Sequence, residues 1–261
     1  GQRVAVIGGG LLGLEAAYGL AKAGANVSVV HLMDRLMERQ LDARAAAMLK
    51  HEVEGRGIAV HLNAQTTAIR GRGRVEAVTL EDGRNLAADL VVVAAGIRPS
   101  VDLARTADLD INRGTVVDDH LQTSRPGIFA IGECAEHRGV CYGLVEPAYE
   151  QARVLAERLA GAPAAYQGSA IATNLKVAGV SVYSAGDFLG GAGSEAIVFS
   201  DPGLGLYKKL VLRDGRLTGA VLFGDTSDGL WYLDLIRSGA AVAAFRDDLA
   251  FGPPPAQRRA A

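Results

Sequence analysis

The stretch Val4-Ala-Val-Ile-Gly-Gly-Gly-Leu-Leu-Gly-Leu-Glu-Ala-Ala17 decides the fold that we expect for this chain. Its first four residues are apolar and predict a buried parallel strand, and residues 11–23 predict a helix. Between them, Gly8, Gly10 and Gly13 match G-x-G-x-x-G. The first glycine permits a tight turn, the second lets a pyrophosphate approach the backbone, and the third lets the helix pack closely on the strand. With the helix N–H groups facing the phosphates, the stretch predicts a dinucleotide site.

A second strand, expected over residues 26–31, completes a right-handed βαβ unit. The residue that closes this strand selects the cofactor, because Asp or Glu accepts from a ribose 2′-hydroxyl whereas a nearby Arg favours a 2′-phosphate. That residue is His31, which tolerates either cofactor in its neutral form. Glycine at position 13 favours NADH, so we expect NAD(P)H with a preference for NADH. The alternative, that His31 only ends the strand, stays open.

Composition excludes several classes of protein. The chain has 261 residues, a formal net charge of −2 and scattered basic residues, so it predicts one or two domains and no nucleic-acid face. No apolar run approaches the roughly 20 residues of a membrane span, and no secretory signal is visible, which predicts a cytoplasmic protein without a membrane partner. Cys134 and Cys141 are too few for a disulfide framework or an iron–sulfur cluster, and we predict no metal site.

The middle of the chain predicts more of an α/β sheet. Residues 89–94 form a continuous apolar run that ends in Ala95-Gly96-Ile97-Arg98-Pro99. Small residues such as Ala95 and Gly96, at the carboxyl end of a parallel strand, suit the ligand crevice of an open sheet. Further elements are a helix over 41–55 beginning near Asp42, a strand over 58–62, a hairpin of 66–70 and 75–80 with a turn at 81–84, a short helix over 101–107 and a strand over 114–118.

Residues 128–131 predict a buried strand that ends at Gly132-Glu133. A carboxylate at that point could accept hydrogen bonds from a sugar or a ribityl chain. A long helix is expected over 144–160.

The last third of the chain predicts a small β-rich domain with one helix. Strands are expected over 176–184, 195–200, 206–213 and 216–224. A helix over 228–238 would begin with Asp228 as its N-cap. We find no nucleophile–base pair in this part.

Three signals in this order resemble the pyridine-nucleotide–disulfide oxidoreductase superfamily over residues 3–160: the glycine pattern at 8–13, the strand exit at 95–99, and Thr123 to Glu133. The runs 29–33, 36–42, 132–137 and 142–145 are similar to the large subunits of assimilatory NAD(P)H nitrite reductases. The stretches 175–179, 224–228 and 231–237 are similar to the module that follows in those subunits and in rubredoxin reductases.

The resemblance implies a role for particular residues. The NAD(P)H pyrophosphate region would lie against Gly8, Gly10, Leu11, Leu12 and Gly13. Glu15, the candidate catalytic residue, would lie near the junction of nicotinamide and flavin, and Gly96 would close the nicotinamide side. The FAD ribityl–phosphate region would lie against Gly132 and Glu133, and the isoalloxazine edge would approach Leu144 and Val145.

The implied activity is hydride transfer from NAD(P)H to flavin, followed by single-electron transfer to an acceptor domain or protein. The implied fold is α/β: a Rossmann-like NAD(P)-binding domain over 1–99, the C-terminal half of an FAD-binding domain over 100–163 and a small α+β domain over 164–252, followed by a disordered tail over 253–261. A homodimer is compatible with the sequence, which does not set the oligomeric state.

Departures from the superfamily limit what we expect of the chain alone. The first FAD-binding glycine pattern would lie upstream of Gly1, and the paired redox cysteines and the sirohaem-ligating cysteines are absent. We therefore expect that this chain alone neither reduces nitrite nor retains FAD. Two other functions stay open: a reductase that feeds rubredoxin or ferredoxin, and a non-catalytic nucleotide-binding or assembly domain.

Overall fold

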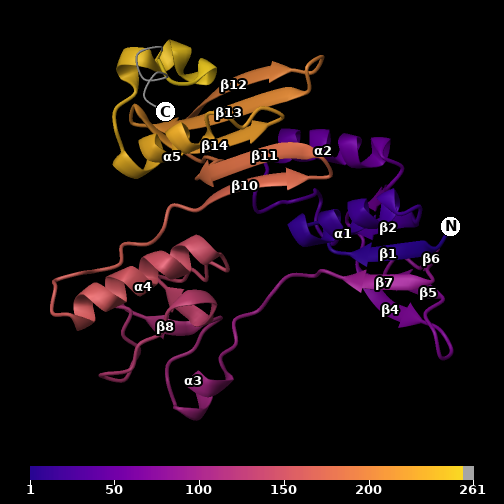
Figure 1. Cartoon of the computed structure of the whole chain (residues 1–261), viewed down its shortest axis with the longest axis horizontal. Coiled ribbons are helices and arrows are strands. Elements are labelled where there is room, and N and C mark those ends of the chain that lie inside the picture. The colour runs from indigo at the N-terminus through magenta and orange to yellow at the C-terminus, as the bar shows by residue number, and fades with distance from the viewer. Residues whose placement is uncertain (255–261) are drawn as a thin grey trace. The chain divides into compact units, whose positions relative to one another are not determined.

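The computed structural model describes residues 1–254, so predicted tail residues 255–261 lie outside the described residues. The chain divides into two compact units, which are described separately (Figure 1). One contains Gly1–Gly96 and the described residues from Ala172 onward, and the other contains Ile97–Ile171. The sequence-based boundaries at 99, 163 and 252 stay predictions. Among residues 1–254, no helix combines the length and apolar character needed to cross a membrane.

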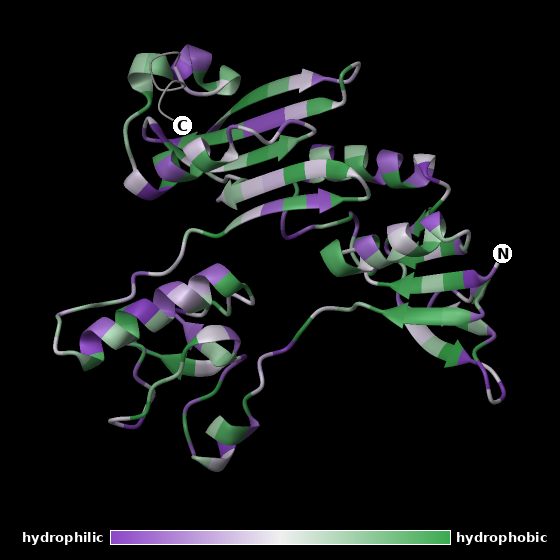
Figure 2. Cartoon of the chain, viewed as in Figure 1, coloured by the Kyte–Doolittle hydropathy of each residue, from purple (hydrophilic) through white to green (hydrophobic). Residues whose placement is uncertain are grey.

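A four-stranded parallel sheet carries the first part of the chain, as the βαβ pattern predicted. Its strand order is β3-β2-β1-β7, so β1 is paired with β2 on one side and β7 on the other. In Figure 2, β1 and β7 are largely green. The central strand β1 is mostly buried by its neighbours, whereas the edge strand β7 is only partly covered. The elements are β1 Arg3–Ile7, α1 Leu11–Lys22, β2 Asn26–Val30, α2 Ala43–Gly55, β3 Ala59–His61 and β7 Leu90–Val93.

Between β3 and β7 the chain forms a three-stranded antiparallel sheet in the order β4-β5-β6. Its strands are β4 Thr66–Arg70, β5 Ala77–Leu80 and β6 Asn85–Ala87. The predicted pairing of 66–70 with 75–80 is present. The predicted turn at 81–84, where Gly83 has a positive φ of 86°, joins β5 to β6 and not the two strands of that hairpin. The third strand, β6, was not predicted because its three residues are too short to show a strand pattern.

The C-terminal part forms a five-stranded antiparallel sheet in the order β10-β11-β14-β13-β12. The prediction of one strand over 176–184 is wrong. The chain reverses at Ala178 and Gly179, whose φ angles of 47° and 83° suit a two-residue hairpin loop. Alanine seldom adopts a positive φ, so the presence of alanine at position 178 did not indicate a turn in the sequence. The elements are β10 Ala172–Val177, β11 Val180–Gly186, β12 Glu195–Asp201, β13 Leu206–Arg213, β14 Arg216–Phe223, α5 Gly229–Ser238 and the 3-10 segment η2 Ala243–Phe251.

Asp228 occupies the predicted N-cap position of α5, but its side chain makes no capping hydrogen bond. The carboxylate instead accepts from Lys208 Nζ at 2.7 Å. Lys208 is 7% exposed, and a buried ammonium group requires a charged partner more than a helix end requires a cap.

The parallel sheet and the C-terminal sheet share one hydrophobic core. Val6 and Leu49 belong to the same cluster of buried side chains as Val177 and Val221. Burial of these residues links parts of the chain that are far apart in sequence, which explains why they form one compact unit.

The Ile97–Ile171 unit is built on the helix α4, with a short parallel pair, β8 and β9. The predicted buried strand over 128–131 is wrong: Phe129 makes a single bridge to Gln122, and Ile128 is 40% exposed. An apolar run becomes a strand only where a neighbour supplies a ladder of hydrogen bonds, and within the described residues β8 pairs with 135–137 instead. The elements are α3 Asp102–Thr106, β8 Thr115–Val117, the 3-10 turn η1 Gly132–Cys134, β9 Ala135–His137 and α4 Val145–Leu159.

Candidate functional site

A cavity of about 480 Å³ opens at the carboxyl ends of the parallel strands. This edge is where ligands bind in open α/β sheets, because the loops that follow the strands meet there. The wall is built from the turn after β1, the end of β2 and the loop beyond it, the loop before β4, and the residues after β7. The lining residues are 7–11, 30–33, 38–40, 64–66 and 94–96.

The three glycines of the motif have different surroundings. A Cβ on Gly8 would lie 2.2 Å from the Ala94 carbonyl oxygen, and one on Gly13 would lie 2.0 Å from the Gly8 oxygen. Backbone oxygen atoms thus leave no room for a side chain at these two positions, which explains why both are glycine. Gly10, in contrast, has no atom within 4 Å of its Cβ position and lines the cavity. The protein itself does not use this space, which leaves room for a ligand's phosphate groups.

Helix α1 begins at this open position. Gly10 is its N-cap in an extended conformation, no side chain caps the helix, and its first turn contains no acidic residue. The first N–H groups of a helix have no partner within the helix and carry its positive dipole end. Leu11 lines the cavity, whereas Gly13 is buried and the Leu12 side chain is 70% exposed. Together these features favour an anion at the helix start.

His31 closes β2 and lines the cavity, as predicted, but both of its ring nitrogens already have partners. The Gly9 N–H donates to Nδ1 at 3.0 Å, and Nε2 lies 3.1 Å from Glu38 Oε2. Because Nδ1 accepts, Nε2 carries the proton and donates it to the carboxylate. The ring is 8% exposed. Sequence reasoning missed Glu38, since it follows the end of the strand by several residues.

The other predicted residues are distributed over both units. Ala95 and Gly96 line the cavity, and Gly96 has a φ of 93°. Glu15 is exposed on α1 and does not line the cavity.

The predicted flavin residues belong to the Ile97–Ile171 unit. The Gly132 N–H donates to Gln151 Oε1 at 2.7 Å, and Glu133 is exposed. Leu144 is the N-cap of α4, which no side chain caps, and the Val145 side chain is 71% exposed. The start of α4 therefore has no side-chain cap and lies beside the exposed Val145 side chain, with Glu146 in the first turn of the helix.

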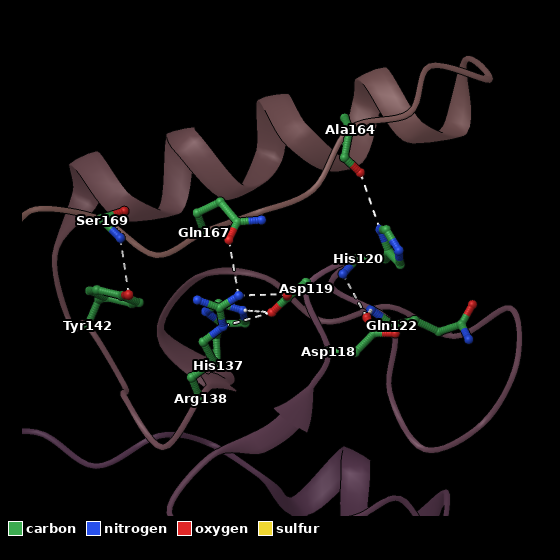
Figure 3. A network of polar contacts seen from close by, with 10 residues as sticks. All are labelled: Asp118, Asp119, His120, Gln122, His137, Arg138, Tyr142, Ala164, Gln167 and Ser169. Atoms are coloured by element: carbon green, nitrogen blue, oxygen red, sulfur yellow. Dashed lines mark hydrogen bonds and ion pairs between the residues drawn. The ribbon is translucent and has the colours of Figure 1, made fainter. Parts of the chain in front are cut away.

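A second polar network, in the same unit, ties β9 to the segment that follows β8 (Figure 3). Asp119 Oδ1 accepts from His137 Nε2 and Arg138 Nε, each at 2.9 Å, and its Oδ2 accepts from Arg138 Nη2 at 2.6 Å. Arg138 and then His137 lower the pKa of Asp119 from its usual 3.8 to about 2. Arg138 also donates to Gln167 at 3.1 Å. Sequence reasoning did not identify this network.

Comparison with known proteins gives two family matches. Residues 1–168 match pyridine nucleotide-disulphide oxidoreductases, and residues 172–240 match the C-terminal domain of rubredoxin NAD+ reductases. The second match starts where β10 starts.

Individual relatives are similar over nearly the whole chain. A nitrite reductase [NAD(P)H] of Bacillus subtilis is 50% identical over 243 residues, which are 93% of this chain and 30% of that protein. The nitrite reductase (NADH) large subunit of Escherichia coli is 40% identical over 95% of this chain and 30% of its own length. Among solved structures, a ferredoxin reductase from Rhodopseudomonas palustris has a TM-score of 0.78 at 30% identity, covering 93% of this chain and 63% of that one. The chain thus spans about a third of the two curated relatives.

Proposed function

Because the chain belongs to the pyridine nucleotide-disulphide oxidoreductase family, we propose that it binds NAD(P)H in the cavity beside α1. In this proposal it is the NAD(P)H-oxidising module of a flavin-dependent reductase that resembles the nitrite reductases. The acceptor of the electrons and the preference for NADH are parts of the proposal.

The observation that carries the proposal is the empty space at Gly10. A pyrophosphate there would meet no side chain and would face the N–H groups of the uncapped first turn of α1. Gly8 and Gly13 act indirectly, since they allow the turn and the helix to approach closely enough to form this cradle. Leu11 would contact the phosphates, and we propose that Leu12 also lies against the pyrophosphate region. Ala95 and Gly96 would border the nicotinamide half of the ligand.

The family also implies FAD, and four residues of this chain would hold part of it. Gly132 and Glu133 would contact the ribityl–phosphate region, and Leu144 and Val145 would contact the ring edge. The uncapped start of α4 and the exposed Val145 fit such a ligand. When bound, the flavin supplies hydride acceptance and single-electron release. Glu15 stays the proposed residue at the nicotinamide, with its exposed carboxylate available for orientation.

A reductase that feeds ferredoxin or rubredoxin is the second candidate. The match of residues 172–240 to the rubredoxin reductase C-terminal domain and the similarity to a ferredoxin reductase favour it. A non-catalytic nucleotide-binding domain is a third candidate. It would bind NADH but would not support NADH-dependent reduction of ferricyanide in the flavin-loaded, full-length protein. Comparison of nitrite, ferredoxin and rubredoxin as acceptors in that protein separates the first two candidates.

The variant Gly10→Ala tests the nucleotide site. We expect NADH to bind the purified chain at least about tenfold more weakly, because the added methyl group occupies the space for the pyrophosphate. The free energy of unfolding should fall by no more than about 1 kcal/mol, because the added methyl group meets open space and the remaining cost is that of alanine as a helix N-cap. Calorimetric titration and urea unfolding measure the two quantities. Unchanged NADH affinity would place the pyrophosphate elsewhere.

A further inference from the structure

We propose that Glu38 recognises the adenosine ribose of the dinucleotide and selects NADH against NADPH. The proposal rests on the proposed nucleotide site and assigns to a loop residue the role that the end of β2 has in other dinucleotide-binding sheets. It explains how a site with His31 at that position can still discriminate between the two cofactors.

Contacts with the glycine turn bring Glu38 back to the end of β2. The Met37 N–H donates to the Gly9 carbonyl oxygen at 3.1 Å, while the Gly9 N–H donates to His31. Leu36 and Met37 are completely buried, so the segment that leads directly into Glu38 is anchored in the core. A Cβ at position 9 would lie 2.7 Å from the His31 ring and from Leu36. These contacts hold the Glu38 carboxylate at the cavity wall.

The hydrogen-bonding capacity of Glu38 suits a sugar hydroxyl. Glu38 Oε2 accepts a hydrogen bond from His31 Nε2 at 3.1 Å, and the Glu38 side chain remains 23% exposed. Each carboxylate oxygen can accept more than one hydrogen bond, so Oε1 can accept from a ribose hydroxyl. His31 has no such capacity, because its acceptor nitrogen receives the Gly9 N–H and its donor nitrogen faces Glu38. A 2′-phosphate in the same place would meet a negative charge instead.

The charged residues at the cavity predict how the loss of the Glu38 charge would change the preference between NADH and NADPH. Among the cavity-lining residues of the described chain, Glu38 is the only acidic residue and Arg39 is the only Lys or Arg. Arg39 Nε lies 4.0 Å from Glu38 Oε1, and its side chain is 83% exposed. Arg35 does not line the cavity and is paired with Asp34 at 3.1 Å. Without the Glu38 charge, Arg39 would remain as an uncompensated cation that suits a 2′-phosphate.

The test compares the dissociation constants of NADH and NADPH for the purified chain and for Glu38→Gln. Glutamine keeps an oxygen that can accept from His31, so the loop should retain its conformation. We expect weaker NADH binding, tighter NADPH binding, and a combined shift of the affinity ratio towards NADPH of about tenfold or more. The matched control is Glu81→Gln, the same substitution at an exposed acidic residue of the same unit that lies outside the cavity wall.

A ratio within about twofold of the parent chain in Glu38→Gln would overturn the proposal, as would an equal shift in Glu81→Gln, which would indicate a general charge effect. Urea unfolding of each variant shows that the fold is retained. If the unaltered chain binds neither NADH nor NADPH, the proposed nucleotide site fails and the role of Glu38 fails with it. If NADH binds but the ratio stays unmoved, only the role of Glu38 fails.

Discussion

Asp119 shows at the scale of one residue how a carboxylate stabilises a loop without taking part in the proposed chemistry. It receives three hydrogen bonds from two side chains, His137 and Arg138. His137 is 1% exposed and lies 4.8 Å from the Tyr166 ring, so its position depends on this carboxylate and on packing. Because the positively charged Arg138 favours the ionised form of Asp119, the free energy of unfolding depends on pH where this carboxylate titrates.

The pKa of Asp119, lowered to about 2, predicts the direction of that dependence. In the unfolded chain the carboxyl group binds its proton near pH 3.8, and in the folded chain only near pH 2. The unfolded state therefore binds more protons in this window, and stability is lost as the pH falls from about 4 to about 2. Asp119→Asn should flatten the plot of unfolding free energy against pH between 5 and 2. Asp110→Asn, which alters an exposed carboxylate of the same unit, is the control. Identical slopes for the two variants would contradict the assignment.

At the scale of the element, helix α1 contains two glycines in opposite situations. Gly13 is buried against the Gly8 carbonyl oxygen, and a Cβ there would lie 2.0 Å from it. Gly19 is exposed and has nothing within 4 Å of its Cβ position. The first glycine is required by the distance between helix and strand, whereas the second only lowers helix stability.

Alanine substitutions at the two positions should therefore have opposite effects. Gly13→Ala forces α1 away from the turn and should destabilise the chain by about 1–3 kcal/mol, the usual cost of overpacking, and weaken NADH binding. Gly19→Ala should stabilise it by about 0.5–1 kcal/mol, because alanine is the better helix former. Urea unfolding measures both effects. Destabilisation by Gly19→Ala, or a neutral Gly13→Ala, would be inconsistent with the packing described for α1.

At the scale of the whole molecule, one buried hydrogen bond joins the start of α2 to the C-terminal sheet. Asp42 caps α2 by accepting from the Ala45 N–H at 3.0 Å, and its second oxygen accepts from the Tyr207 hydroxyl at 2.6 Å. Burial and this bond raise the pKa of Tyr207. Both residues are buried, and Lys209 Nζ lies 3.8 Å from the carboxylate. The cap of one helix thus depends on a residue of a distant sheet.

A double-mutant cycle with Asp42→Asn and Tyr207→Phe should reveal this link. Asparagine can still cap α2 through its amide oxygen, so the cycle measures the coupling between the charged carboxylate and the Tyr207 hydroxyl without loss of the cap. We expect a coupling energy of about 1.5–3 kcal/mol in the free energy of unfolding, the range for a hydrogen bond to a charged group. Additive effects, within about 0.3 kcal/mol, would mean that the two sheets are joined by the apolar core alone.

The sequence by itself determined the βαβ unit, the cap at Asp42, the tight turn at Gly83 and the family. These features depend on neighbouring residues: an apolar strand, a glycine at a sterically closed position, or a side chain three residues from the amide it caps. The glycine pattern also located the cavity, because the turn after β1 forms part of its wall in any such sheet.

Only the tertiary structure decided which groups meet at that cavity and which apolar runs become strands. Glu38 reaches His31 through the folding of a buried loop, and Tyr207 reaches Asp42 from 165 residues away. Residues 128–131 lack a strand ladder within the described chain, and the run over 176–184 is divided by a turn that places alanine at positive φ. Hydrogen-bond partners of this kind are set by which surfaces the folded core brings together, and no local pattern of residue types encodes that choice.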